Sequence, residues 1–321
     1  MKILTHIARL FVAATFLFSG FVKLVDPIGS SYKFEEYFSV DVLNIEFLIP
    51  YALPFSIVLI IIEIMLGVML LIGFKPKFTT WSLFLITFLF LFLTWYSAFY
   101  DKVTDCGCFG DAVKLTPWET FNKNVLLIIL TGFLISQVKK IKPLLPSKLL
   151  GWISLGSLMV FLYITSHVLT HLPIIDFRAY AIGKNIQEGM KEIAVDGLPK
   201  VHDFFLETED GEDLTDALLA SSKVLFVVAY DIDISEEAGF EAMKKATDLA
   251  IESGYTVYGL SASYIDDLKL LNENQNFNFD WLFVDGTVLK TIIRANPGII
   301  TLEKGTVTGK WNWIDTEDFK P

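Results

Sequence analysis

The sequence predicts a membrane-embedded all-α helical bundle of about five transmembrane helices, followed by a C-terminal α/β domain. Hydrophobic residues make up 53% of the 321 residues and charged residues only 20%, whereas about a quarter of a soluble chain is charged. Long apolar runs fill the first half, and short strand and helix patterns alternate in the second. We expect the membrane domain at 1–172, a linker at 173–198 and the C-terminal domain at 199–321.

Five apolar runs each approach or exceed the roughly 20 residues that a helix needs to cross hydrocarbon. The first follows Lys2 and Arg9 as a signal peptide would, but no convincing small-residue cleavage site ends it, so we expect an uncleaved helix. The fourth begins at a capping signal, Thr116-Pro117-Trp118-Glu119. The runs are Ile7–Leu24, Phe47–Phe74, Thr79–Tyr100, Pro117–Val138 and Leu149–Leu172.

The charges between these runs predict the orientation. With the N-terminus inside, the two opposite loops and their flanks hold five basic and nine acidic residues. The positive-inside rule therefore places the N-terminus in the cytoplasm and the C-terminal domain outside it, at a cytoplasmic (inner) membrane. The cytoplasmic segments hold eight basic residues and no acid: Lys2, Arg9, Lys75, Lys77, Lys139, Lys140, Lys142 and Lys148.

Net charge is unevenly placed along the chain. Residues 1–172 hold 13 basic and 10 acidic residues, whereas residues 173–321 hold 13 basic and 27 acidic ones. Because phosphate binding needs clustered Lys and Arg, we expect no nucleic acid as a partner. The two cysteines exclude a scaffold of several disulfides and a four-cysteine metal site.

From Pro199 the pattern alternates between strands and helices. Val224–Tyr230 is a continuous apolar run, as expected of a buried central strand. Val201–Thr208 alternates like a strand and ends at the turn signal Asp210-Gly211. This order predicts a mixed sheet covered by helices. The further expected elements are helices at 235–253, 263–272 and 287–295, extended segments at 255–261 and 281–285, and a hairpin of 299–303 with 306–312.

This order resembles a thioredoxin-like domain of the membrane-tethered, peroxiredoxin-related kind. The resemblance is carried by VHDFFLETEDGEDLT, VLFVVAY and ANPGIITLEKGTV. It implies a cis proline at Pro297 and redox cysteines just after the central strand. Here that stretch reads Asp231-Ile232-Asp233-Ile234-Ser235-Glu236, without a cysteine. Since disulfide exchange needs a thiolate, we expect this domain to bind a peptide or dock on a membrane partner.

Cys106-Gly107-Cys108 contains both cysteines of the chain, on a loop predicted to lie where disulfides persist. Gly107 permits the tight turn that bridging would need, and such a strained bridge would be readily exchanged. Asp105 and Asp111 disfavour a thiolate, which Lys102 could partly offset. Three interpretations stay open: a redox pair, a structural staple, or a soft-metal site for Cu(I) or Zn.

The membrane half also resembles a known family. The pattern is carried by Arg9, by FSGFVKLVDPIGSSYKFEEYF and by Glu63 within IIEIMLGVMLLIGF. It resembles DoxX-type membrane proteins, and DCGCFGD at Asp105–Asp111 is similar to the MauE branch of that group. The resemblance implies a redox-associated helical membrane protein, linked to disulfide formation or quinone-coupled electron transfer.

Glu63 lies near the middle of the second apolar run, where a charge is costly to bury. It could be protonated, or pair with Arg9 or another basic group. The functional interpretation is proton uptake linked to the reduction of a membrane carrier; the structural one is an interhelical hydrogen bond. Other charges near the membrane are expected to snorkel or to pair along helices, namely Lys23 with Asp26 and Lys33 with Glu36.

His167 and His171 lie four residues apart, a spacing that permits joint metal binding. No third ligand is visible nearby in the sequence, so we expect these histidines to form hydrogen bonds and expect no metal.

Together these expectations describe a membrane redox component. Cys106 and Cys108 would exchange disulfides with an extracytoplasmic thiol protein and pass electrons to a membrane quinone, with no covalently bound cofactor. Glu63 would assist proton transfer, and the C-terminal domain would present or recruit the thiol partner. The alternative is a non-enzymatic, membrane-anchored assembly protein whose thioredoxin-like domain docks a client and whose cysteine pair is structural or metal-binding. The sequence leaves open whether the chain is an enzyme.

Overall fold

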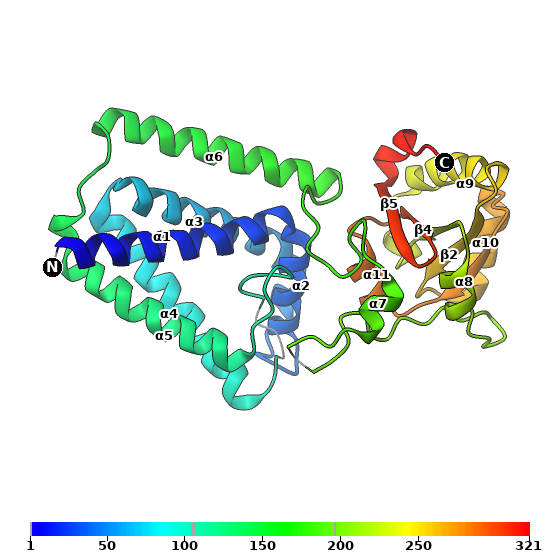
Figure 1. The fold of residues 1–321 in the computed structure, drawn as a ribbon, viewed down its shortest axis with the longest axis horizontal. Helices are drawn as coiled ribbons and strands as arrows, with labels where there is room; N and C mark the ends of the chain where they lie inside the picture. The colour runs from blue at the N-terminus through cyan, green and yellow to red at the C-terminus, as the bar shows by residue number, and fades with distance from the viewer. Residues whose placement is uncertain (1, 104–106, 196) are drawn as a thin grey trace. The chain divides into compact units, whose positions relative to one another are not determined.

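The computed structural model describes residues 2–103, 107–195 and 197–321. The chain divides into two compact units, residues 1–169 and 170–321 (Figure 1). The segment predicted as a linker, 173–198, lies within the second unit, where Tyr180 and Ile186 are part of the hydrophobic core.

The first unit is helical. Among the described residues, four helical segments are long and apolar enough to cross a membrane: Lys2–Val25, Glu46–Ile72, Pro76–Tyr100 and Ser147–Thr170. The fourth predicted run also forms a helix and begins at the predicted Thr116 capping box, but Glu119 and Lys123 make its first turns more polar. The helices are α1 (Lys2–Val25), α2 (Pro27–Phe38), α3 (Ala52–Ile72), α4 (Pro76–Tyr100), α5 (Pro117–Ser136) and α6 (Ser147–Thr170), with short 3-10 helices η1 (Glu46–Tyr51) and η2 (Val138–Lys140).

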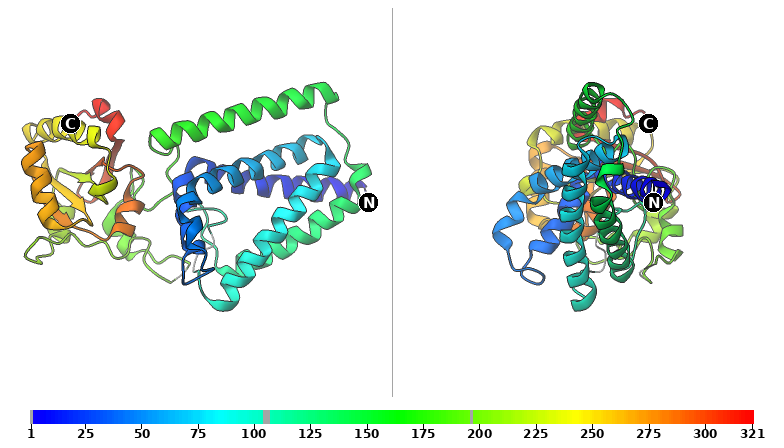
Figure 2. Two further views of the ribbon diagram at one scale, coloured as in Figure 1. Left: turned by 180° about the vertical axis from the view of Figure 1, so that it is seen from behind. Right: turned by 90° about the vertical axis from the view of Figure 1, so that its left-hand side faces the viewer.

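Two helix pairs form the bundle, α1 with α3 and α4 with α5 (Figures 1 and 2). The first pair packs backbone to backbone, because a Cβ atom added at Gly20 would lie 2.7 Å from Ile64 Cβ. Val12, Phe16 and Leu83 belong to the buried core between the pairs. Helix α6 contacts a separate cluster through Phe161 and Ile164, with Leu24 and Ile60 at its centre.

Arg9 marks one end of this bundle. Its Nε donates to the Leu70 carbonyl (2.9 Å) and its Nη2 to the Leu71 carbonyl (2.8 Å), so the guanidinium caps the last turn of α3. Nη1 donates to the Lys142 carbonyl at 3.0 Å. Arg9 therefore binds carbonyl groups of α3 and of the segment before α6 rather than the Glu63 carboxylate.

The second unit contains a five-stranded sheet in the order β3-β2-β1-β4-β5. Strands β1 to β3 are parallel, whereas β4 is antiparallel to β1 and β5 to β4. Lys304 and Gly305, both with positive φ, form the turn between the last two strands. The strands are β1 (Val224–Val228), β2 (Thr256–Ser261), β3 (Asp280–Phe283), β4 (Gly298–Glu303) and β5 (Thr306–Asn312).

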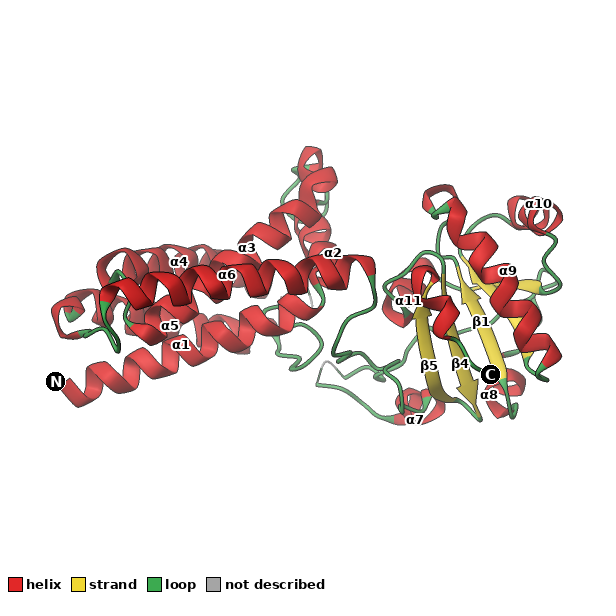
Figure 3. Ribbon diagram, turned by 90° about the horizontal axis from the view of Figure 1, so that it is seen from above, coloured by secondary structure: helices red, strands yellow, loops and turns green. Residues whose placement is uncertain are grey.

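Helices cover both faces of the sheet. Leu225 and Val227 of β1 face a core formed with α9, whereas Phe226 faces the core on the α11 side, so the apolar run of β1 is buried on both faces as predicted. Figure 3 shows α9 lying across one face. The helices are α7 (Ile186–Lys191), α8 (Thr215–Ala220), α9 (Glu237–Glu252), α10 (Ile265–Gln275) and α11 (Gly286–Ile292), with 3-10 helices η3 (Ile232–Ile234) and η4 (Trp313–Asp318).

The predicted strand at 201–208 is wrong. This segment meets the edge of the sheet at one residue, where Glu207 and Phe283 exchange backbone hydrogen bonds of 3.2 and 2.8 Å. The alternation arises because Phe204 and Leu206 are buried, whereas Phe205 and Glu207 are exposed. Burial at every second residue therefore reflects an extended segment here and not a strand that is hydrogen-bonded along its length to a neighbour.

Buried charges connect the start of the second unit to β5. The Asp176 carboxylate accepts from Arg178 Nε and from Lys310 Nζ, both at 2.7 Å. Burial raises the pKa of Asp176, but the Arg178 and Lys310 charges outweigh it and hold the pKa at about 2. Burial and the Arg178 charge lower the pKa of Lys310 to about 7. This cluster fixes the segment that precedes α7 against the sheet.

Candidate functional site

The cysteine loop lies at the end of the bundle opposite Arg9. Ser19 Oγ of α1 donates to the Cys108 carbonyl at 2.7 Å, and a Cβ atom at Gly110 would lie 3.0 Å from Val22. Gly107 has φ +64°, a conformation that glycine adopts without strain. Cys106 and Asp105 lie outside the described residues. Of the predicted cysteine pair, the structure therefore places Cys108, which is half-buried.

Cys108 lines a small cavity between the helices. Its volume is about 60 Å³, which leaves room for a few water molecules but not for a quinone ring. The walls come from α1 to α4 and from the loop. The lining residues include Lys23, Lys33, Tyr37, Ile60, Phe90, Thr94, Gly107 and Cys108.

Glu63 forms an ion pair with Lys23 Nζ beside this cavity. The two side chains are only 3% and 11% exposed, and they project from α3 and α1 respectively. Breaking a buried pair by removing one partner is strongly destabilising, so each charge depends on the other. The expectation of an intramembrane partner for Glu63 holds, with Lys23 rather than Arg9 in that role. Lys23, which was expected to snorkel or to pair along the helix with Asp26, instead pairs with Glu63, and Asp26 accepts from the Gly29 N–H and caps α2.

Two further lysines lie against the cysteine loop. Lys33 pairs with Glu36 at 3.0 Å, as predicted, and its Cγ lies 3.0 Å from where a Cβ of Gly107 would be. Lys123 Nζ lies 4.3 Å from the centre of the Phe109 ring. The predicted supporting residues Lys102 and Asp111 are exposed. The loop is therefore surrounded by more positive charge than the sequence neighbours of the cysteines suggested.

Sequence reasoning missed Lys23 and Lys33 as parts of this site. A signal was present, since Lys23 and Glu63 are opposite charges inside two long apolar runs. Charges in such runs have to find partners. Their separation of 40 positions in the sequence hid the pairing, which requires the antiparallel register of α1 on α3.

In the second unit, the loop that replaces the expected cysteines lies beside the predicted proline. The Asn296–Pro297 peptide bond is cis, the geometry that the resemblance implies for Pro297. Asn296 Nδ2 donates to the Asp231 carbonyl at 2.7 Å, and the Glu236 N–H donates to the Asn296 carbonyl at 3.2 Å. Residues 170–321 contain no cysteine, so the loop beside this cis proline carries no thiol.

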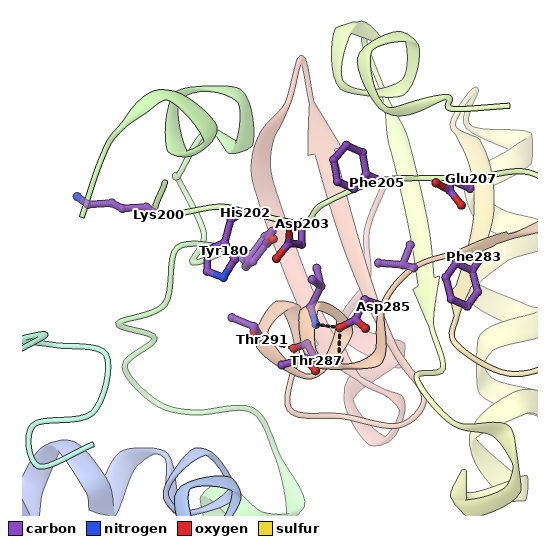
Figure 4. Close-up of a pocket in the computed structure, with 12 residues that line it drawn as sticks. Tyr180, Lys200, His202, Asp203, Phe205, Glu207, Phe283, Asp285, Thr287 and Thr291 are labelled. Atoms are coloured by element: carbon purple, nitrogen blue, oxygen red, sulfur yellow. Dashed lines mark hydrogen bonds between the residues drawn. The ribbon is translucent and has the colours of Figure 1, made fainter. Parts of the chain in front are cut away.

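A second cavity, of about 450 Å³, opens on the second unit (Figure 4). Phe205 and Phe283 in its wall are 54% and 53% exposed. Burial and the Asp203 carboxylate raise the pKa of Tyr180, whose side chain also lines it. Asp285 caps α11 by accepting from the Thr287 N–H at 2.8 Å. The cavity thus combines apolar rings with carboxylates.

The two histidines have separate contacts. His171 Nδ1 lies 2.7 Å from Asp315 Oδ1, and the His167 ring stacks on Tyr163. In the part of the chain that the structure describes, no group of three or more His, Cys, Asp and Glu side chains is arranged to hold a metal ion.

Four long apolar helices followed by a mixed sheet with a cis proline before β4 define a membrane protein with a thioredoxin-like C-terminal domain. Residues 1–137 match the family described as Methylamine utilisation protein MauE. No curated protein matches the chain. A solved structure, described as the solution structure of a thiol:disulfide interchange protein from Bacteroides sp., is similar at 16% identity and a TM-score of 0.27, over 33% of this chain and 74% of that one.

Proposed function

We propose that this protein is a membrane thiol–disulfide exchange component that passes electrons from a thiol protein to a membrane quinone through Cys106 and Cys108. The observation that carries the proposal is the position of Cys108. It lines a cavity inside an apolar bundle, and the same cavity is lined by Lys23 of the buried Lys23–Glu63 pair. Ionisable side chains inside a membrane span are costly to bury, and they commonly mark a functional site.

The chemistry balances with a quinone as the acceptor. One thiolate of a dithiol partner attacks the Cys106–Cys108 disulfide and forms a mixed disulfide. The second thiol of the partner then breaks this bond, so the partner leaves with a disulfide of its own and the pair is left as two thiols. Reoxidation of the two thiols releases two electrons and two protons. One quinone takes up the two electrons and the two protons and becomes a hydroquinone. Glu63 assists this proton transfer. Since the cavity is too small for the ring, the quinone approaches from the lipid side.

The orientation is part of the proposal. Arg9 and Lys142 lie at one end of the bundle, with the basic segments at 75–77 and 139–142 in the connections at that end. The positive-inside rule supports a cytoplasmic position for this end in an inner membrane. The cysteine loop and the C-terminal unit would then lie outside the cytoplasm, where disulfides are maintained.

The C-terminal unit would recruit the thiol partner rather than react with it. Its sequence lacks a thiol at the position where the related fold carries one. The exposed rings of Phe205 and Phe283, next to the carboxylates of Asp203, Glu207 and Asp285, suit a segment that is apolar and basic.

Trapping in intact cells tests the exchange. Cys106→Ser and Cys108→Ser each leave one thiol, which cannot resolve the intermediate formed with the partner. We expect at least one variant to accumulate a disulfide-linked complex that a reducing agent dissolves. The double Cys→Ser variant is the matched control and should form none. If neither single variant forms such a complex, the proposal is wrong.

The alternative function is a non-enzymatic assembly protein. The thiol-free loop at 231–236 favours it, because the C-terminal unit then only binds a client. In that case the cysteines brace their loop, as the Ser19 contact to Cys108 also does. A cysteine pair that remains in one redox state in all growth conditions would support this function and contradict the redox one.

A further inference from the structure

The cavity that Cys108 lines is also lined by a buried cation, which is paired with a buried anion. Lys23 and Cys108 both line it, and Glu63 is held on Lys23. The Lys23 ammonium also lies 5.4 Å from the centre of the Phe90 ring, and the Lys23 side chain is only 11% exposed, so little bulk water reaches it. Charges in such surroundings act over longer distances than charges in water.

The remaining charged groups around the loop are less able to act on the thiol. Lys33 is one-third exposed and paired with Glu36, and Lys123 faces the Phe109 ring. Helix α4 contributes only uncharged side chains to the cavity. Among the described residues, the charged groups at the loop or at the cavity are Lys23 on α1, Lys33 and Glu36 on α2, Lys123 on α5, and the exposed Lys102 and Asp111 on the loop segment, with Glu63 of α3 paired to Lys23. Asp105, the other carboxylate of the loop, lies outside the described residues.

We infer that Lys23 stabilises the thiolate form of Cys108 and that Glu63 limits this effect, so that the buried pair sets the reactivity of the thiol. Lys23 is thus a positioning residue that acts through its charge. The inference deepens the proposed function and rests on it, since a tuned thiolate matters only if Cys108 exchanges disulfides. It also gives Glu63 a role in the resting state, besides the transfer of protons.

Removing the Lys23 charge and removing the Glu63 charge should change the alkylation rate of Cys108 in opposite directions. In a Cys106→Ser background, the full-length protein in detergent is alkylated with iodoacetamide over a range of pH. Only the thiolate reacts, so the rate at neutral pH follows the thiolate fraction. Lys23→Gln should slow alkylation at pH 7 about tenfold, which corresponds to a midpoint about one pH unit higher. Glu63→Gln should speed it and move the midpoint to lower pH.

Both variants break the same ion pair, so loosened packing would change both rates in the same direction. Lys23→Arg keeps the charge and should retain a rate close to that of the parent. Lys77→Gln, at an exposed lysine at the Arg9 end of the bundle, is the matched control and should leave the profile unchanged. Equal or parallel changes in the Lys23 and Glu63 variants, or no change in either, would overturn the inference.

This measurement needs neither a thiol partner nor a quinone, so it separates the two proposals. If the profiles shift in opposite directions but no mixed disulfide is trapped, the electrostatic inference stands and the proposed function fails. If mixed disulfides form but the profiles do not shift, the proposed function stands and the electrostatic inference fails.

Discussion

At the scale of single residues, buried charge is the feature that the two units share. Lys23 and Glu63 are paired in the first unit, and Asp176 is paired with Arg178 and Lys310 in the second. Water no longer solvates these groups, so each holds its charge only through its partner. Removing one partner of such a pair strongly lowers the stability of the folded unit, so substitutions at these residues are the most informative.

Asp176→Asn should destabilise the second unit by about 3–5 kcal/mol, because it leaves the Arg178 and Lys310 cations buried without an anion. Hydrogen exchange of the full-length protein, followed in peptides from β4 and β5, measures the loss. Asp248→Asn is the matched control, since Asp248 forms a partly exposed pair with Lys244 on α9. Unchanged protection in the Asp176 variant would contradict the role of this cluster.

The same carboxylate predicts a pH dependence. Its pKa is about 2 in the folded unit, against 3.8 as its ordinary value. The unfolded chain therefore binds more protons between these values, and the stability from Asp176, about 2 kcal/mol, is complete above pH 4 and is lost as the pH falls toward 2. Lys310 adds a rise in stability between its folded pKa of about 7 and 10.5, because there the unfolded lysine binds more protons. The Asp176→Asn variant should lack the acid limb of this profile.

At the scale of elements, the close contact of α1 with α3 determines whether the ion pair can form. An added Cβ atom would lie 2.7 Å from Ile64 Cβ at Gly20 and 3.0 Å from Leu17 Cγ at Gly67, so Gly20 has no room for a side chain and Gly67 has little. This contact sets the register of the two antiparallel helices, one turn away from Lys23 and Glu63. Small residues at helix contacts in membranes have this effect generally.

Gly20→Ala should therefore destabilise the bundle by about 1–3 kcal/mol, because the new methyl group would lie 2.7 Å from Ile64 Cβ. It should also make Cys108 more accessible to alkylation, since the two helices have to separate. Gly156→Ala on α6 is the control, because nothing lies within 4 Å of the added atom. Thermal unfolding in detergent compares them, and equal midpoints would refute the packing argument.

Most elements could be predicted from local patterns. The Thr116 capping box starts α5, and the apolar run at 224–228 is the central strand. Helix α2 was missed because its composition is mixed, although Asp26-Pro27 is a helix-start signal. The predicted strand at 201–208 failed because strand pairing needs a neighbour, and an extended segment beside a sheet shows the same alternation.

At the scale of the whole molecule, each unit supplies a different part of the proposed function. The helical unit holds Cys108 and the buried pair, and the α/β unit supplies a cavity with exposed rings. The chemistry of the site was partly visible in the sequence, as Cys108 and Glu63. The cavity that Cys108 shares with Lys23 was not, because it depends on four helices whose contacts join residues far apart in the chain.

Recruitment of the partner makes a prediction at this scale. Replacing Phe205 and Phe283 together by Ser should reduce the amount of mixed disulfide trapped by a single-cysteine variant severalfold, because the exposed rings supply the apolar contact. Tyr264→Ser, at an aromatic residue that is 85% exposed outside this cavity, is the control. Equal trapping in both would assign recruitment to another surface.

The most direct test of the central claim is the redox state of the Cys106–Cys108 pair in membranes whose quinone content is controlled. Sequential alkylation before and after reduction gives the oxidised fraction. We predict that this fraction falls when quinone is depleted and recovers when quinone is restored, while a thiol substrate is present throughout. A pair that stays fully oxidised or fully reduced under both conditions would contradict the claim that this loop carries electrons into the membrane.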